Sequence, residues 1–213
     1  MTAVFFDLDG TLTDPKEGIT KCVQHALQRL NEAVPSNDDL EWVIGPPLRA
    51  SFVELVGEAR ADQAVALYRE RFSDIGWREN QLYQEIPTVL QQLKSRGVQL
   101  YVATSKPRVF AERIVDHFDL AGYFEQVFGS ELDGTRQDKT ELLTWARQKT
   151  KQRDSIMDAC MIGDRKHDII GGRNNDMHTV GITWGYGSVT ELESAGAHDI
   201  VHQPDDLLAV LPS

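Results

Sequence analysis

The sequence has few cysteines and no long apolar segment. Its 213 residues include only two cysteines, Cys22 and Cys160, and neither belongs to a CxxC pair. We therefore expect two buried free thiols in a reducing compartment. No apolar run approaches the ~18 residues that span a bilayer. The N-terminal residues reach Asp7 without the basic segment of a signal peptide. These absences argue against a membrane partner and predict a cytoplasmic protein.

Positive charge is also scarce. Lys and Arg number 22 against 33 Asp and Glu, which gives a formal net charge of −11. Such a chain repels phosphate backbones, so we expect no nucleic-acid polymer as partner. A small anionic substrate remains open if a metal or a local basic group neutralises its site. The hydrophobic fraction of 41% is that of an ordinary folded protein of one or two domains.

Over most of the chain, short apolar runs alternate with stretches of helical periodicity. The apolar runs predict strands at 4–6, 98–103, 126–128, 159–162, 178–183 and 200–201. Helical spacing of apolar residues predicts helices at 88–96, 107–118, 138–150, 166–174 and 205–210. Alternating β and α elements predict an α/β fold with a parallel sheet and right-handed crossovers.

One helical block interrupts this alternation directly after the first strand. Its apolar residues predict helices at 16–34, 47–57 and 61–76, and no strand is expected until about residue 82. We therefore expect an α/β core made of residues 1–14 and 83–213, with an all-helical domain at 15–82 inserted into it.

Polar residues gather at the carboxyl ends of the expected strands, where ligands bind in parallel sheets. Two acids follow the first strand, a hydroxyl follows the second, a lysine begins a helix, and two acids follow the strand at 159–162. These residues are Asp7, Asp9, Thr104, Lys139, Asp164 and Asp168. We expect them to meet at one edge of the sheet.

Four of these segments resemble the motifs of the haloacid dehalogenase superfamily of phosphatases. DLDGTLT at 7–13 resembles the opening motif, and Thr104, Lys139 and the Gly163-Asp164…Asp168 pattern look like the other three motifs in the same order. The resemblance covers nearly the whole chain. It implies a Rossmann-like core and a Mg²⁺-dependent phosphatase with a helical cap.

Two further segments narrow the resemblance. IGPPL at 44–48 and GYGS at 185–188 resemble phosphoglycolate phosphatases and a related group of 5′-nucleotidases. Our main hypothesis is therefore a phosphoglycolate phosphatase-like hydrolase of small phosphomonoesters. We expect the protein to be a monomer or a homodimer. A 5′-nucleotidase acting on nucleoside monophosphates is the alternative, followed by a sugar-phosphate mutase and a non-enzymatic phospho-acceptor module. Asp9 argues against dehalogenases and phosphonate hydrolases.

The acids suit phosphoryl transfer through a phosphorylated aspartate. Asp7 is the expected nucleophile. Asp9 faces the same side of an extended segment, so it can protonate the leaving oxygen and then deprotonate water. Mg²⁺ prefers oxygen ligands, and we expect them from Asp7, the Asp9 carbonyl and Asp164. Asp168 lies one helical turn on and is expected to orient metal-bound waters or Lys139.

The remaining expected site residues handle the phosphate or the rest of the substrate. Thr104 offers a hydroxyl, and Gly10 permits a tight turn whose amides can cradle phosphate. Lys139 neutralises charge, with Lys106 as a substitute at the same edge. Ser105 and Lys106 are expected substrate contacts. Any of these residues alone would be an ordinary turn or surface residue.

Arg49 is the expected anion-binding residue of the helical block. It follows the loop at 45–47, and a guanidinium binds carboxylate or phosphate bidentately. A solvated surface charge is the alternative interpretation of Arg49.

Overall fold

The computed structural model describes residues 3–150 and 159–211. The chain divides into two compact units, which we call the core unit (Met1–Thr13 with Leu82–Ser213) and the helical unit (Asp14–Gln81). None of the described helices combines the length and the apolar composition that a bilayer crossing requires. Cys22 and Cys160 are buried thiols and form no disulfide with each other, as expected.

The core unit is built on a six-stranded parallel sheet with the strand order β5-β4-β1-β6-β7-β8. Its strands are β1 (Ala3–Phe6), β4 (Gln99–Pro107), β5 (Gln126–Ser130), β6 (Ala159–Gly163), β7 (His178–Ile182) and β8 (Asp199–Val201). The predicted fold class, an α/β protein with a parallel sheet, is therefore confirmed.

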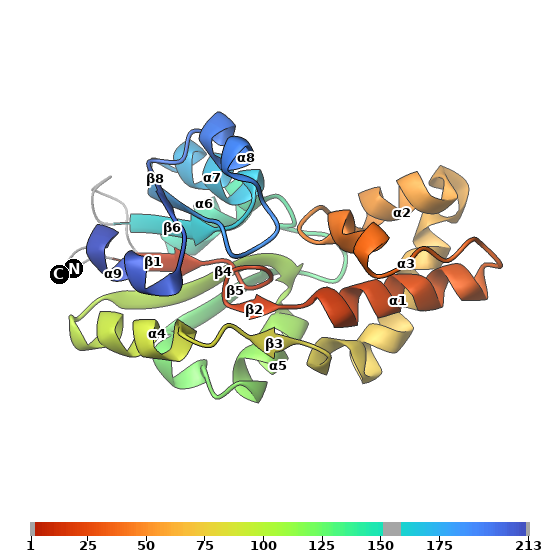
Figure 1. Cartoon of the computed structure of the whole chain (residues 1–213), viewed down its shortest axis with the longest axis horizontal. Coiled ribbons are helices and arrows are strands. Elements are labelled where there is room, and N and C mark those ends of the chain that lie inside the picture. Colours follow the sequence, from red (N-terminus) through yellow and green to blue (C-terminus); the bar gives the residue numbers. More distant parts are fainter. Residues whose placement is uncertain (1–2, 151–158, 212–213) are drawn as a thin grey trace. The chain divides into compact units, whose positions relative to one another are not determined.

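Helices cover both faces of this sheet. One face carries α6 (Lys139–Thr150), α7 (Lys166–Asn174) and α8 (Val189–Ala195) (Figure 1). The other carries α4 (Ile86–Ser95), α5 (Arg108–His117) and α9 (Leu207–Val210) (Figure 1). The short 3₁₀ helices η3 (Ala121–Tyr123) and η5 (Pro204–Asp206) complete this unit. Parallel strands need crossovers, which places helices on both faces.

The central strand β1 is buried along its whole length. The Phe5 ring stacks on Tyr101 with 4.9 Å between ring centroids. On the same side, Phe128 meets the edge of Trp145 at 5.2 Å. Aromatic pairs of this kind add to the free energy gained by apolar burial. Strand β1, which leads directly into Asp7, is thus packed and paired between its neighbours β4 and β6.

The helical unit contains α1 (Lys16–Arg29), η1 (Asp38–Val43), α2 (Leu48–Val56), α3 (Glu58–Asp74) and η2 (Gly76–Arg78). Its core includes Phe52, Tyr68 and Phe72, whose rings form one edge contact and one stacked contact. Two short strands, β2 (Thr13–Asp14) and β3 (Gln81–Leu82), pair with each other where the chain passes from one unit to the other. The predicted helical insertion after the first strand is confirmed.

Some element bounds differ from the sequence-based expectations. Helix α1 ends at Arg29 instead of residue 34, because Asn31 adopts φ 56° and the Glu32 N–H turns back to Leu27 O at 2.9 Å. Helix α8 was not predicted. It is seven residues long, and Leu192 is its one buried residue, so it has no helical periodicity to detect. The two-residue strands β2 and β3 were also missed.

Asn175 joins α6 to α7, and we expect Asn175→Ala to be strongly destabilising. Its Nδ2 donates to Thr140 O at 3.0 Å and Gly171 O at 2.9 Å, while its Oδ1 accepts from Thr144 Oγ1 at 2.8 Å. Truncation removes these bonds and leaves buried polar groups unpaired, so the free energy of unfolding should fall by about 2–4 kcal/mol in urea titrations. The exposed neighbour Asn174 serves as control, since Asn174→Ala should cost less than about 1 kcal/mol. Equal losses in both variants would contradict this role.

Candidate active site

The strand register brings the expected acids to one edge of the sheet. Phe6 of β1 lies opposite Val102 of β4 and Ile162 of β6. Asp7 follows directly, and its N–H donates to Ile162 O at 2.9 Å. Asp164 follows β6 in the same way. The first and fourth expected motifs therefore meet because their strands are neighbours, although 157 positions separate the two acids.

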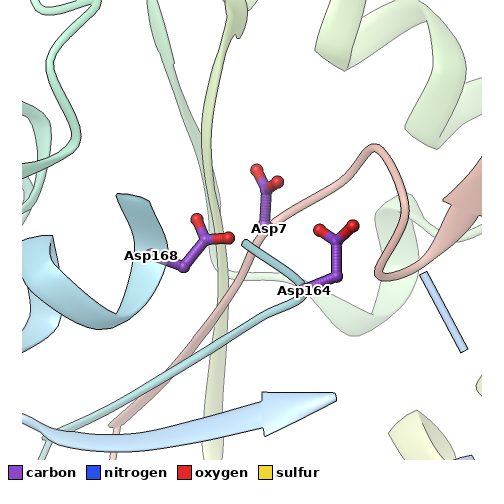
Figure 2. Close-up of side chains that lie close together, drawn as sticks. All are labelled: Asp7, Asp164 and Asp168. Atoms are coloured by element: carbon purple, nitrogen blue, oxygen red, sulfur yellow. The ribbon is translucent and has the colours of Figure 1, made fainter. Parts of the chain in front are cut away.

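Three carboxylates converge at this edge. Ligand oxygens of Asp7, Asp164 and Asp168 all lie within 4.8 Å of one another, and all three residues are buried. Figure 2 shows the side chains rising from separate segments and turning their carboxylates toward a common space. Asp7 and Asp164 come from strand ends, and Asp168 from the first turn of α7. Such a group of oxygen ligands could hold a metal ion.

Lys139 lies against two of these acids. Its Nζ is 3.0 Å from Asp7 Oδ1, 2.7 Å from Asp168 Oδ1 and 2.8 Å from Ala103 O. Burial alone would lower the pKa of Lys139, but Asp168 and Asp7 outweigh it and raise that pKa. Lys139 is therefore a buried cation and not an ordinary surface residue.

One lysine does not balance three buried carboxylates. Burial, followed by repulsion from Asp168 and Asp7, raises the pKa of Asp164 well above its usual value. Burial chiefly raises the pKa of Asp168 to about 6, although Lys139 opposes this shift. A further cation would balance the negative charge of the cluster. An all-oxygen ligand set fits Mg²⁺ better than a soft metal.

Asp164 is oriented by two hydrogen bonds from other segments. The Tyr186 N–H donates to its Oδ2 at 2.8 Å, and Thr11 Oγ1 donates to its Oδ1 at 3.4 Å. The Trp184 indole N–H in turn donates to Thr11 O at 3.1 Å. No sequence pattern assigns a role to Tyr186, Thr11 or Trp184. Residues 185–188 carry only a family resemblance at the level of sequence.

Gly10 permits the tight turn after β1. It has φ +81°, and a Cβ there would lie 2.3 Å from Asp164 Oδ2. Its own N–H donates to Thr13 O at 2.7 Å. Residue 10 therefore contributes the turn and the close approach to Asp164, while its amide is used inside the turn.

Lys106 pairs with Asp9 rather than with the three-acid cluster. Its Nζ lies 2.5 Å from Asp9 Oδ2, and both side chains are largely buried. Burial raises the pKa of Asp9, and the charge of Lys106 opposes that shift. The cation beside Asp7 is Lys139, so Lys106 does not substitute for Lys139 there. The expected contact between Lys106 and substrate stays a prediction.

Thr104 and Ser105 lie near the carboxyl end of β4. Thr104 is buried, and its Oγ1 accepts from the Lys106 N–H at 3.3 Å. The Ser105 carbonyl accepts from Ser130 Oγ at 2.8 Å. The Thr104 hydroxyl keeps a proton to donate. Both residues lie at the expected edge of the sheet, and their contact with a substrate stays a prediction.

Arg49 lies in the first turn of α2, within the helical unit. Its guanidinium pairs with Glu58 Oε1 at 2.7 Å and Asp62 Oδ1 at 2.8 Å. The predicted anion-binding role of Arg49 therefore faces competition from two carboxylates of its own unit.

Comparison with known proteins places this constellation in a family. Residues 4–182 match the haloacid dehalogenase-like hydrolase family. A 5′-nucleotidase from Pseudomonas aeruginosa is 47% identical over 97% of this chain and 92% of its own length. A tyrosine-protein kinase, PtkA, from Mycobacterium bovis is 36% identical over 93% of this chain and 68% of its own length.

More distant relatives and a solved structure agree on the family. A phosphoglycolate phosphatase from Aquifex aeolicus is 26% identical over 99% of this chain and 97% of its own length. The crystal structure of a predicted phosphatase from Clostridium acetobutylicum superposes with a TM-score of 0.93, at 42% identity and 99% coverage of both chains. The chain is thus a haloacid dehalogenase-like hydrolase, an enzyme of the phosphatase type.

Proposed function

We propose that the protein is a Mg²⁺-dependent phosphomonoester hydrolase that acts on nucleoside 5′-monophosphates through a phosphorylated Asp7. The observation that carries this proposal is the convergence of Asp7, Asp164 and Asp168 beside Lys139. A buried acid cluster with one lysine suits phosphoryl transfer, which depends on positioning and charge neutralisation.

Asp7 and Asp9 carry out two successive steps in this proposal. An Asp7 oxygen forms a bond to phosphorus while the bond from phosphorus to the ester oxygen breaks. The Asp9 carboxyl donates its proton to the leaving ester oxygen. Asp9 then takes a proton from water, whose oxygen bonds to phosphorus as the bond to Asp7 breaks. The 5′-hydroxyl product leaves after the first step and inorganic phosphate after the second.

The other site residues neutralise negative charge and position the phosphoryl group. The Lys139 ammonium neutralises Asp7 and the transferring group, and the Thr104 hydroxyl donates to a phosphoryl oxygen. Asp7, Asp164 and the Asp9 carbonyl would hold Mg²⁺, with Asp168 alongside. A bound Mg²⁺ supplies positive charge for the phosphoryl oxygens.

The nucleotide class replaces phosphoglycolate as the preferred substrate. The sequence resemblance favours phosphoglycolate as substrate and leaves nucleotides as the alternative. The likeness to the Pseudomonas aeruginosa 5′-nucleotidase is much stronger than that to the phosphoglycolate phosphatases, so it supports the alternative.

We also propose that the helical unit acts as a cap that selects the part of the substrate beyond the phosphate. Arg49 remains the predicted anion contact of that cap. It can serve there by exchanging or sharing its ion pairs with Glu58 and Asp62.

Phosphate release from a panel of esters tests the substrate class. With Mg²⁺ present, kcat/KM for the best nucleoside 5′-monophosphate should exceed that for phosphoglycolate and hexose phosphates by at least about ten-fold. Chelation of the metal should abolish the activity. A preference for phosphoglycolate, or weak activity on every ester, would contradict the nucleotide class. Complete absence of phosphate release would contradict hydrolysis and favour the mutase or phospho-acceptor alternatives.

A further inference from the structure

The turn that carries Asp164 and Asp168 is held from a different helix by Glu191. Glu191 Oε1 accepts from the Lys166 backbone N–H at 2.8 Å and from Arg165 Nε at 2.9 Å. Lys166 is the first residue of α7, so its N–H has no acceptor within that helix. A carboxylate of α8 supplies the missing acceptor.

This contact joins a short chain of bonds that ends at the acid cluster. The Arg165 N–H donates to Asp168 Oδ2 at 3.1 Å, and the Asp168 N–H donates to Arg165 O at 3.0 Å. Lys166, which Glu191 holds, lies two residues from Asp164 and two from Asp168. A shift of the Lys166 backbone would therefore move both acids.

The loop that leads to Glu191 also lies directly on Asp164. A Cβ at Gly187 would lie 1.8 Å from Asp164 O, and one at Gly185 would lie 2.5 Å from Asp164 Oδ2. The Glu191 N–H donates to Ser188 Oγ at 3.1 Å, which fixes the end of this loop to the start of α8. The segment from 185 to 191 thus holds the Asp164 turn through its backbone and through the Glu191 side chain.

We infer that Glu191 is a positioning residue that fixes Asp164 and Asp168 for Mg²⁺. The inference rests on the proposed function, because it assigns these acids to the metal. Glu191 itself contacts Arg165 and Lys166 rather than substrate. Groups that orient metal ligands in this way change metal affinity by about 10–100-fold when removed.

Calorimetric titration of substrate-free protein with MgCl₂ tests the inference without relying on turnover. Glu191→Ala should raise the Kd for Mg²⁺ about ten-fold. Glu191→Gln keeps a neutral acceptor for Lys166 and should raise it about threefold, because its bonds are no longer charge-assisted. Glu193→Ala is the matched control, since Glu193 is exposed on the same helix. It should leave the Kd unchanged.

Activity gives a second readout that separates positioning from general damage. The Mg²⁺ concentration for half-maximal hydrolysis should rise with the Kd, while kcat at saturating Mg²⁺ changes by less than about threefold. A Mg²⁺ Kd equal to the wild-type value in folded Glu191→Ala, or in Glu191→Gln if the alanine variant does not fold, would overturn the inference. Wild-type protein that binds no Mg²⁺ and releases no phosphate would overturn the proposed function and the inference with it.

Discussion

Asp7→Asn should reduce kcat at least about a thousand-fold while the protein remains folded. The amide keeps the size of the side chain but is a poor nucleophile for phosphorus. Lys139 loses one partner but keeps its ion pair with Asp168 at 2.7 Å, so its charge stays compensated. The substitution also removes one of three carboxylates that repel one another. Steady-state phosphate release and thermal unfolding, measured on the same preparation, check both parts of the expectation.

Asp116→Asn provides the matched control for this experiment. Asp116 is exposed on α5, so losing its charge should leave kcat and the melting temperature close to those of the wild type. A folded Asp7→Asn protein that hydrolyses esters at the wild-type rate would remove Asp7 from the role of nucleophile.

Lys139→Met should lower kcat/KM by about a hundred-fold or more and destabilise the metal-free protein. The change leaves Asp7 and Asp168 without their buried cation. Losing one partner of a buried ion pair costs about 3–5 kcal/mol. Urea titrations in EDTA and steady-state kinetics with Mg²⁺ measure the two effects.

The stability loss in Lys139→Met should depend on pH in a defined direction. The pKa of Asp168 is already raised to about 6 in the folded protein, above its unfolded value of about 3.9. The folded state therefore binds more protons, and stability from this group falls as pH rises from about 4 to 6. Without Lys139 the folded pKa rises further, so the fall should extend to higher pH. Lys149→Met, an exposed change on the same helix, should show no such shift.

The positions of the acids were predictable from the sequence because they depend on strand ends. A run of apolar residues that stops at Asp7, and another that stops before Asp164, define strands whose carboxyl ends share one edge of a parallel sheet. The register of β1 and β6 then brings Asp7 and Asp164 close together. Asp168 follows because it lies in the first turn of the helix that begins beside Asp164.

The partners of these acids were not predictable in the same way. Lys106 and Lys139 both lie at the correct edge, and only the packing of α6 against β4 decides that Lys139 reaches Asp7 while Lys106 reaches Asp9. Backbone donors such as the Tyr186 N–H leave no trace in a pattern of side chains. Glu191 lies in α8, a helix too short and too exposed to be detected by periodicity.

Trapping the phosphorylated enzyme tests the central claim most directly. Wild-type protein turning over a nucleoside 5′-monophosphate with Mg²⁺ is quenched in acid at times that cover the first turnover, reduced with borohydride and analysed by peptide mass spectrometry. Borohydride converts an aspartyl phosphate to homoserine. We predict homoserine at position 7 in samples that contain substrate and Mg²⁺, and none in samples that lack either. Unmodified Asp7 throughout the first turnover, while phosphate is released, would contradict the account.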